Sequence, residues 1–269
     1  MTGTEAPDGG EALIRAAEDL GAEYIFCSSG SEWAPVWEAF ARRREAGTPG
    51  PRYLDLAHET TAVGMATGYA AVTGRPQVVL LHAAAGLLQG ANAIHGALLS
   101  CAPVVICSGE SAGYGDAAGP DPGSQWYRNL SVVGGPQAMA APFTKWACAA
   151  ADVSVLYGMV KRAGEHAAQP PAGPVYVNTP VEVLLAPWQP SPADGPAPYL
   201  FRANSSVGMF SLPLNRVSSN SPNNALRRRR MTSRITSKVN GVITANIAAK
   251  MPHPKAFMST SPVRQRTPS

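Results

Sequence analysis

Glu59, His82 and Ser31 carry the carboxyl, imidazole and hydroxyl groups that together could form an acid–base set. Glu59 lies in the segment 56–70 (LAHETTAVGMATGYA). At offsets of three, four, seven and eleven it is followed by Ala62, Val63, Ala66 and Ala70. In a helix these positions share one apolar face, so the carboxyl group points toward the interior. There it must keep a proton or find a donor, and we expect it to exchange a proton with a bound molecule.

Each of these residues also has a purely structural interpretation. A glutamate in the first turn of a helix complements the helix dipole. Ser31 could cap a following helix, and His82 at the end of an apolar strand could be a structural histidine. His95, His166 and His253 lack the spacing of metal ligands, so we expect no metal site in this chain.

Apolar strand-like runs alternate with helical periodicity from residue 10 to about 180. Strands are predicted at 23–27, 52–56, 77–82, 103–107, 143–147 and 174–178. Helices are predicted at 11–20, 32–45, 59–74 and 153–168, with a further helix that follows the small residues after 82 and ends near residue 100. This order predicts an α/β fold, a doubly wound and mostly parallel sheet with helices on both faces. Ligands of such sheets bind at the carboxyl ends of the strands, where Ser31, Glu59 and His82 would converge. The phosphate-binding patterns GxGxxG and GxxxxGK[ST] are absent.

The charge distribution divides the chain into a domain at 1–190 and a tail at 191–269. The first part has 10 lysines and arginines against 17 acidic residues, and the second has 12 against 1. The pI is therefore set by the tail, which has few periodic apolar positions, and we expect it to be disordered. Its composition also fits a truncated or frame-shifted product. A basic tail could bind nucleic acid, but aromatic interleaving and a known motif are lacking, so we do not expect that partner.

Cysteine usage and hydropathy indicate the compartment. Cys27, Cys101, Cys107 and Cys148 lie in apolar runs without a CxxC pair, so we expect buried free thiols. No apolar run reaches about 18 residues and the acidic start lacks the pattern of a signal peptide. We expect a cytoplasmic chain without membrane contact.

Three segments together resemble a known family. They are 21–40 (GAEYIFCSSGSEWAPVWEAF), His58-Glu59 with 68–76 (GYAAVTGRP), and 103–110 (PVVICSGE). The chain from about 10 to 185 resembles the N-terminal pyrimidine-binding domain of thiamine-diphosphate-dependent enzymes such as acetolactate synthase and benzoylformate decarboxylase. In that family a glutamate, matched by Glu59, hydrogen-bonds N1′ of the aminopyrimidine and so activates the cofactor toward 2-oxo acids.

The resemblance also implies roles for further residues. His82 in HAAAG matches a catalytic histidine, and Ser31 a serine that faces the substrate carboxylate. The remaining positions implied are Gly30, Ala85, Gly86 and Gln89 near the cofactor and Gln125 near the substrate. The acetolactate synthases carry proline at Ser29 and Ala85 and arginine at Ala57, so the substrate pocket differs from theirs.

The second half of the cofactor site is missing from the sequence. The family binds the diphosphate through Mg²⁺ on a separate domain, with a Gly-Asp-Gly motif followed by asparagine. The nearest match, Gly115-Asp116-Ala117, lacks that asparagine. We therefore expect a diphosphate-binding domain or subunit in trans, in a homo- or hetero-oligomer, as in a split 2-oxo acid decarboxylase or carboligase. Whether the chain is an active enzyme stays open. The alternatives are a truncated relic, or a non-catalytic dimerisation module that packs through Gly64, Ala66 and Gly68.

Overall fold

The computed structural model describes residues 6–111, 119–121 and 131–191. By internal contacts the chain divides into Met1–Leu200 and Phe201–Ser269, and the described residues all belong to the first unit. The predicted tail, Gln125 and Gly115-Asp116-Ala117 lie outside the described residues. Within the described part, no helix is long and apolar enough to cross a membrane.

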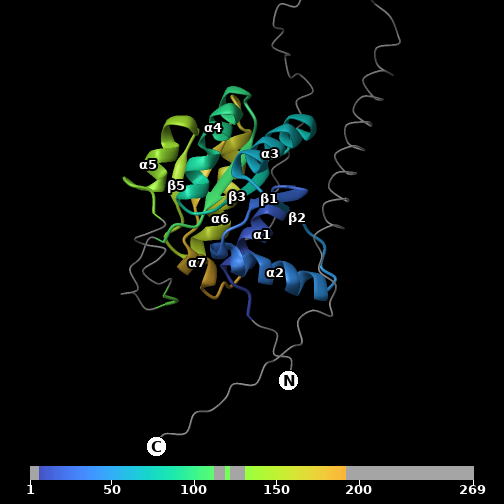
Figure 1. Ribbon diagram of the computed structural model, residues 1–269. Coiled ribbons are helices and arrows are strands. Elements are labelled where there is room, and N and C mark those ends of the chain that lie inside the picture. The colour runs from blue at the N-terminus through green and yellow to red at the C-terminus, as the bar shows by residue number, and fades with distance from the viewer. Residues whose placement is uncertain (1–5, 112–118, 122–130, 192–269) are drawn as a thin grey trace, which may run out of the picture. The chain divides into compact units, whose positions relative to one another are not determined.

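Six parallel strands form one sheet in the order β2-β1-β3-β4-β6-β5 (Figure 1). The strands are β1 Tyr24–Ser28, β2 Arg52–Leu56, β3 Gln77–Leu81, β4 Val104–Ser108, β5 Ala147–Ala149 and β6 Val175–Asn178. In register, Phe26 of β1 pairs with Leu54 of β2 on one side and Val79 of β3 on the other. Strands β1, β3, β4 and β6 are buried throughout, as expected where helices cover both faces. The predicted fold class is confirmed.

Helices cover both faces of the sheet. Helices α1 Gly9–Asp19, α2 Ala34–Glu45 and α6 Val153–Ala168 pack on one face, with α1 between the other two. Helices α3 Glu59–Thr73 and α4 Ala85–Leu99 pack against each other on the opposite face, as Figure 1 shows. The described part of the chain also contains two short helices and two 3₁₀ turns: α5 Pro136–Ala140, α7 Val181–Leu185, η1 Ser31–Trp33 and η3 Ala141–Phe143. The core on the α1 face includes Leu13, Ile25, Val36, Val105 and Leu156.

Local signals explain where α3 begins and ends. His58 is its N-cap, and Nδ1 of His58 accepts a hydrogen bond of 3.1 Å from the amide of Thr60. Gly74 ends the helix in the left-handed conformation, with φ at +70°, which glycine adopts at little cost. The helix therefore starts at Glu59, directly after β2.

Several predicted details are wrong. The strand predicted at 143–147 is β5 at Ala147–Ala149, because the segment Ala141–Phe143, with Pro142 in its middle, forms the 3₁₀ turn η3. The helix predicted from residue 32 begins as the turn η1, and the Ser31 side chain does not cap it. Cys101 is exposed and Cys148 half-buried, so only Cys27 and Cys107 are the buried thiols expected. The short helices α5 and α7 have too few turns to show periodicity and were not predicted.

Candidate functional site

The three residues singled out first lie at one edge of the sheet. Strands β2, β1 and β3 are neighbours and parallel, so their carboxyl ends share that edge. Glu59 follows β2, Ser31 follows β1 and His82 follows β3. The convergence expected from the strand order thus occurs in the fold, and the candidate site consists of this edge and the start of α4.

Glu59 lies against the first turns of α4. Its helix buries Ala62, Val63, Ala66 and Ala70 as predicted, but Glu59 itself is half-buried and not interior. The reason is its place in the first turn, at the open edge of the sheet. A Cβ added to Gly86 would fall 2.9 Å from Oε1 of Glu59, so only glycine lets the carboxyl group approach α4 this closely. Among the described residues none hydrogen-bonds this carboxyl group, which leaves both oxygens available to a ligand.

His82 pairs with a glutamate that sequence reasoning missed. Nδ1 of His82 lies 2.9 and 3.0 Å from the two carboxylate oxygens of Glu32, in η1. The Glu32 side chain is completely buried, whereas 29% of the His82 side chain is exposed. Oε1 of Glu32 also accepts a hydrogen bond of 2.7 Å from the amide of Ala83. Hydrogen bonding to Glu32 raises the pKa of His82 above its ordinary value, although burial opposes the shift.

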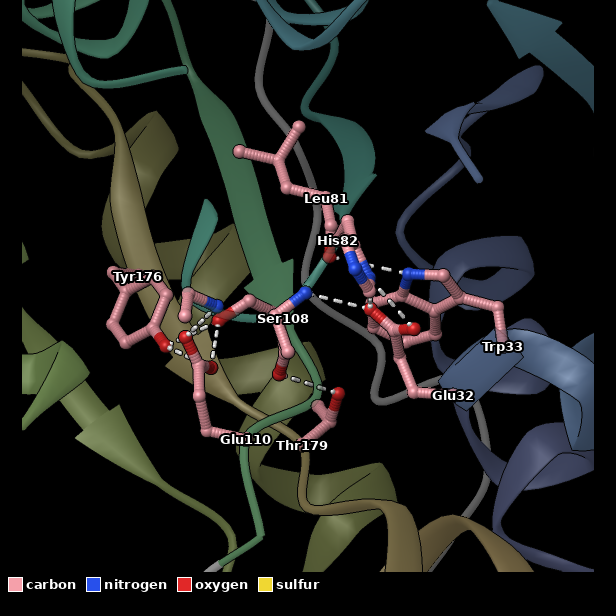
Figure 2. A network of polar contacts seen from close by, with 10 residues as sticks. Glu32, Trp33, Leu81, His82, Ser108, Glu110, Tyr176 and Thr179 are labelled. Carbon is pink, nitrogen blue, oxygen red and sulfur yellow. Dashed lines mark hydrogen bonds and ion pairs between the residues drawn. The ribbon is translucent and has the colours of Figure 1, made fainter. Parts of the chain in front are cut away.

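A second buried glutamate holds the same turn from the other side. Oε1 of Glu110 accepts a 2.7 Å hydrogen bond from the amide of Ala84, and Oε2 accepts one from the hydroxyl of Ser108. The hydroxyls of Ser108 and Tyr176 are 2.6 Å apart, and Tyr176 also donates to Glu110. Figure 2 shows this group on the Tyr176 side and Glu32 on the Trp33 side. Burial raises the pKa of the Glu110 carboxyl group.

The turn between β3 and α4 has an unusual backbone. Ala84, the N-cap of α4, has φ at +50° and ψ at −81°, a conformation that L-residues rarely adopt. Strain of this kind persists only where the surroundings hold it, and Glu32 and Glu110 bind the two amides of Ala83 and Ala84. The turn places His82 and Gly86 side by side, since a Cβ on Gly86 would lie 2.8 Å from Cβ of His82.

The other predicted site residues take different positions. Gly30 touches the His82–Glu32 pair, and Gly86 contacts both Glu59 and His82. Ala85 and Gln89 are exposed on α4, and the carbonyl of Gln89 accepts a 3.0 Å hydrogen bond from the hydroxyl of Thr60. Ser31 is exposed at the same edge. Of the residues suggested for packing against a partner helix, Ala66 is in the core, while Gly64 and Gly68 are exposed.

The sequence carries a signal for these two glutamates. Glu32 and Glu110 each stand four residues or fewer after a mostly apolar strand, β1 and β4, in stretches that are otherwise uncharged. A charged residue so close to a buried strand end needs partners, and parallel strands bring such ends together. Over the described ranges, no three histidine, cysteine or acidic side chains are arranged to hold a metal ion.

This arrangement supports proton exchange. It combines a half-exposed carboxyl group without a hydrogen-bond partner in the described part of the chain, an imidazole paired with a buried carboxylate, and an exposed hydroxyl. Gly86 leaves a space between Glu59 and His82 that any larger residue at position 86 would fill. Such a set can hold a polar ring and move protons beside it.

Comparisons with known proteins give a consistent result. The family "Thiamine pyrophosphate enzyme, N-terminal TPP binding domain" matches residues 7–123. Benzoylformate decarboxylase of Pseudomonas aeruginosa is 34% identical over 151 residues, which cover 53% of this chain and 25% of that protein. The mitochondrial acetolactate synthase catalytic subunit of Aspergillus candidus is 28% identical over 175 residues, covering 65% and 23%.

A solved structure shares the fold. The thiamine diphosphate-dependent 4-hydroxybenzoylformate decarboxylase of Rhodococcus jostii RHA1 matches with a TM-score of 0.55 and 23% identity, over 80% of this chain and 35% of that one. The chain spans about a quarter of the length of the curated relatives named above.

Proposed function

Residues 7–123 belong to the N-terminal TPP-binding domains of thiamine pyrophosphate enzymes, and on this premise we propose that the chain supplies the pyrimidine half of a thiamine diphosphate site. The site would serve the decarboxylation or carboligation of a 2-oxo acid. One observation supports this most strongly: the Glu59 carboxyl group contacts Gly86 and has no hydrogen-bond partner among the described residues. A carboxyl group without such a partner, beside the space that Gly86 leaves, suits the binding of a flat heterocycle.

Each residue of the edge has a role in this proposal. Glu59 would hold the aminopyrimidine through a hydrogen bond from one carboxyl oxygen, with Gly86 leaving the space. His82 would give and take a proton at its exposed side, and the hydroxyl of Ser31 would bind the substrate carboxylate. Bound thiamine diphosphate supplies the carbon nucleophile that loss of carbon dioxide from a 2-oxo acid requires. Gly30, Ala85 and Gln89 would complete the cofactor side, and Gln125 the substrate side.

The diphosphate half belongs to another domain in this proposal. We assign the diphosphate and its Mg²⁺ to a domain or subunit in trans, within a homo- or hetero-oligomer. A relative named benzoylformate decarboxylase supports a 2-oxo acid as substrate, because benzoylformate is one. The free thiols of the four cysteines fit a reducing, cytoplasmic compartment.

Calorimetric titration tests the proposal directly. Thiamine diphosphate with Mg²⁺ is titrated into the chain alone and into its mixture with a candidate diphosphate-domain chain. We expect binding in the mixture only, and Glu59→Gln should weaken it about 10–100-fold, the range for a hydrogen bond to a charged group. Glu38→Gln, at an exposed position of α2, is the matched control and should bind like the wild type.

Three outcomes would contradict the proposal. Equal binding by wild type and Glu59→Gln would exclude Glu59 from the site. Failure to bind with any diphosphate-domain partner would favour a relic or a dimerisation module. Tight binding by the chain alone would refute the assignment of the diphosphate to another domain.

A further inference from the structure

Glu32 is a buried carboxylate that bonds to the side chain of His82. Its carboxylate is completely buried, and both oxygens lie within 3.0 Å of Nδ1 of His82. A buried charge is costly unless hydrogen-bonded, and here the amide of Ala83 and the imidazole provide the bonds. The carboxylate therefore contacts two consecutive residues of the turn that leads into α4.

Two glycines make room for this pair. A Cβ at Gly30 would fall 2.1 Å from Nδ1 of His82 and 2.2 Å from Oε2 of Glu32. A Cβ at Gly109 would fall 2.6 Å from Cγ of Glu32. Glycines at the ends of β1 and β4 thus let the Glu32 carboxylate reach the imidazole of His82. Of the His82 side chain, 29% stays exposed.

We propose that Glu32 is a positioning residue for His82: it keeps the ring hydrogen on Nδ1 and so leaves Nε2 as the nitrogen that exchanges protons. An ionised carboxylate only accepts hydrogen bonds, so the imidazole must donate to it through Nδ1. The neutral ring then accepts a proton at Nε2, and the charged ring returns it from the same atom. The inference rests on the proposed function for the use of that proton.

Three carboxyl groups face His82 from the elements around it. They are Glu32 from η1, Glu59 at the start of α3 and Glu110 after β4, and each raises the pKa of the imidazole. Glu32 has the largest effect, through its hydrogen bond. Removing its charge while keeping its shape should therefore change the titration of His82 more than any other single substitution nearby.

Glu32→Gln is a suitable variant because the amide is isosteric. Its oxygen can still accept from the amide of Ala83, but its NH₂ group, in the place of Oε2, would donate to Nδ1 of His82. The hydrogen of the neutral ring should then move to Nε2. We expect the pKa of His82 to fall by about one unit or more, the scale of a lost opposite charge at this distance.

The measurement is ¹⁵N NMR of the full chain labelled at histidine, recorded as a function of pH. His82 is assigned from the signals missing in His82→Asn. The neutral ring of the wild type should show hydrogen on Nδ1, and Glu32→Gln should show it on Nε2, with Glu32→Asp intermediate in pKa. Glu38→Gln should leave both the pKa and the tautomer unchanged.

Clear results would overturn the inference. A folded Glu32→Gln chain in which His82 keeps its wild-type pKa and tautomer would contradict the positioning role of Glu32. If that variant does not fold by circular dichroism, the wild type still decides, since hydrogen on Nε2 of its neutral His82 would refute the pairing. Because the titration needs no cofactor, a wild type with hydrogen on Nδ1 that binds no thiamine diphosphate supports the positioning and contradicts only the proposed function.

Discussion

The carboxylates of Glu32 and Glu110 bind adjacent backbone amides, those of Ala83 and Ala84, although they come from opposite sides of strand β3. Figure 2 shows Glu32 and Glu110 on the two sides of His82. Together they hold the turn that presents His82 and Gly86 at the edge of the sheet. The geometry of the candidate site therefore depends on two buried acidic residues, and substitutions around this turn give specific expectations.

Gly86→Ala should disturb both the site and the fold. The new Cβ would lie 2.8 Å from Cβ of His82 and 2.9 Å from Oε1 of Glu59, so one of them must move. We expect a loss of about 1–3 kcal/mol in the free energy of unfolding. Thiamine diphosphate binding in the mixed assembly should fall at least about tenfold, a cost of ~1.4 kcal/mol. Urea denaturation and calorimetry measure the two effects.

Gly96→Ala on the same helix is the matched control for Gly86→Ala. Nothing lies within 4 Å of a Cβ at Gly96, so alanine should stabilise α4 by about 0.5–1 kcal/mol without affecting binding. Equal effects of the two substitutions on binding would show that Gly86 does not shape the site.

Ala84→Gly should stabilise the chain. The backbone strain at φ +50° costs about 1–3 kcal/mol, and glycine removes it at an entropic cost of about 0.5–1 kcal/mol. We expect a net gain near 1 kcal/mol in the free energy of unfolding, measured by urea denaturation. Ala93→Gly, within the same helix, should instead lose about 1 kcal/mol. A loss of similar size at position 84 would mean that the turn is unstrained.

Glu110→Gln should change how stability depends on pH. Burial raises the pKa of Glu110 above its ordinary value of 4.5. At pH values between the pKa of the unfolded chain and the raised pKa of the folded chain, the folded chain holds a proton that the unfolded chain has released. Stability therefore falls as the pH rises through this window. Glutamine at position 110 cannot bind this proton, so the variant should lose that part of the slope of unfolding free energy against pH. Its amide oxygen can still accept the hydrogen bond from the backbone amide of Ala84.

Free energies of unfolding at pH steps from about 4 to 8 measure the effect. His82 also has a raised pKa, which adds stability below its unfolded value and loses it as the pH rises through the folded one. Both chains contain His82, and Glu110 has the smallest effect among the groups that raise its pKa, so the difference between the two slopes reports Glu110 together with this smaller effect on His82. Identical slopes would show that the pKa of Glu110 does not change on folding.

Arg43→Met should weaken the contact between α1 and α2. Arg43 is buried and bonds Glu11 at 2.9 Å and Glu18 at 3.0 Å, both on α1. Removing the guanidinium leaves two partly buried carboxylates, and we expect a loss of about 3 kcal/mol in the free energy of unfolding. Arg44→Met, exposed on the same helix, should change stability by less than about 0.5 kcal/mol. Equal losses of stability for Arg43→Met and Arg44→Met in thermal denaturation would contradict this expectation.

Much of the fold was predictable because its signals are local. The strand-like pattern of β2, the apolar runs of β3 and β4 and the periodicity of α6 predicted these elements to within one residue. His58 and Gly74 mark the two ends of α3, and the alternation of strands and helices implies parallel pairing. Placing Glu59 and His82 at one edge needed only that topology. The strand at β5 was misplaced because three residues carry too little pattern.

The amino-acid sequence alone determined the fold class, the residues at the edge of the sheet and the resemblance to a thiamine diphosphate family. Only the tertiary structure decided which charges meet: Glu32 reaches His82 across 50 positions of the chain, and Glu110 reaches Ala84 across 26. Sequence patterns report the burial of a segment, since that depends on its own side chains. The pairing of two buried polar groups depends on how strands and turns distant in sequence are packed, which no local pattern encodes.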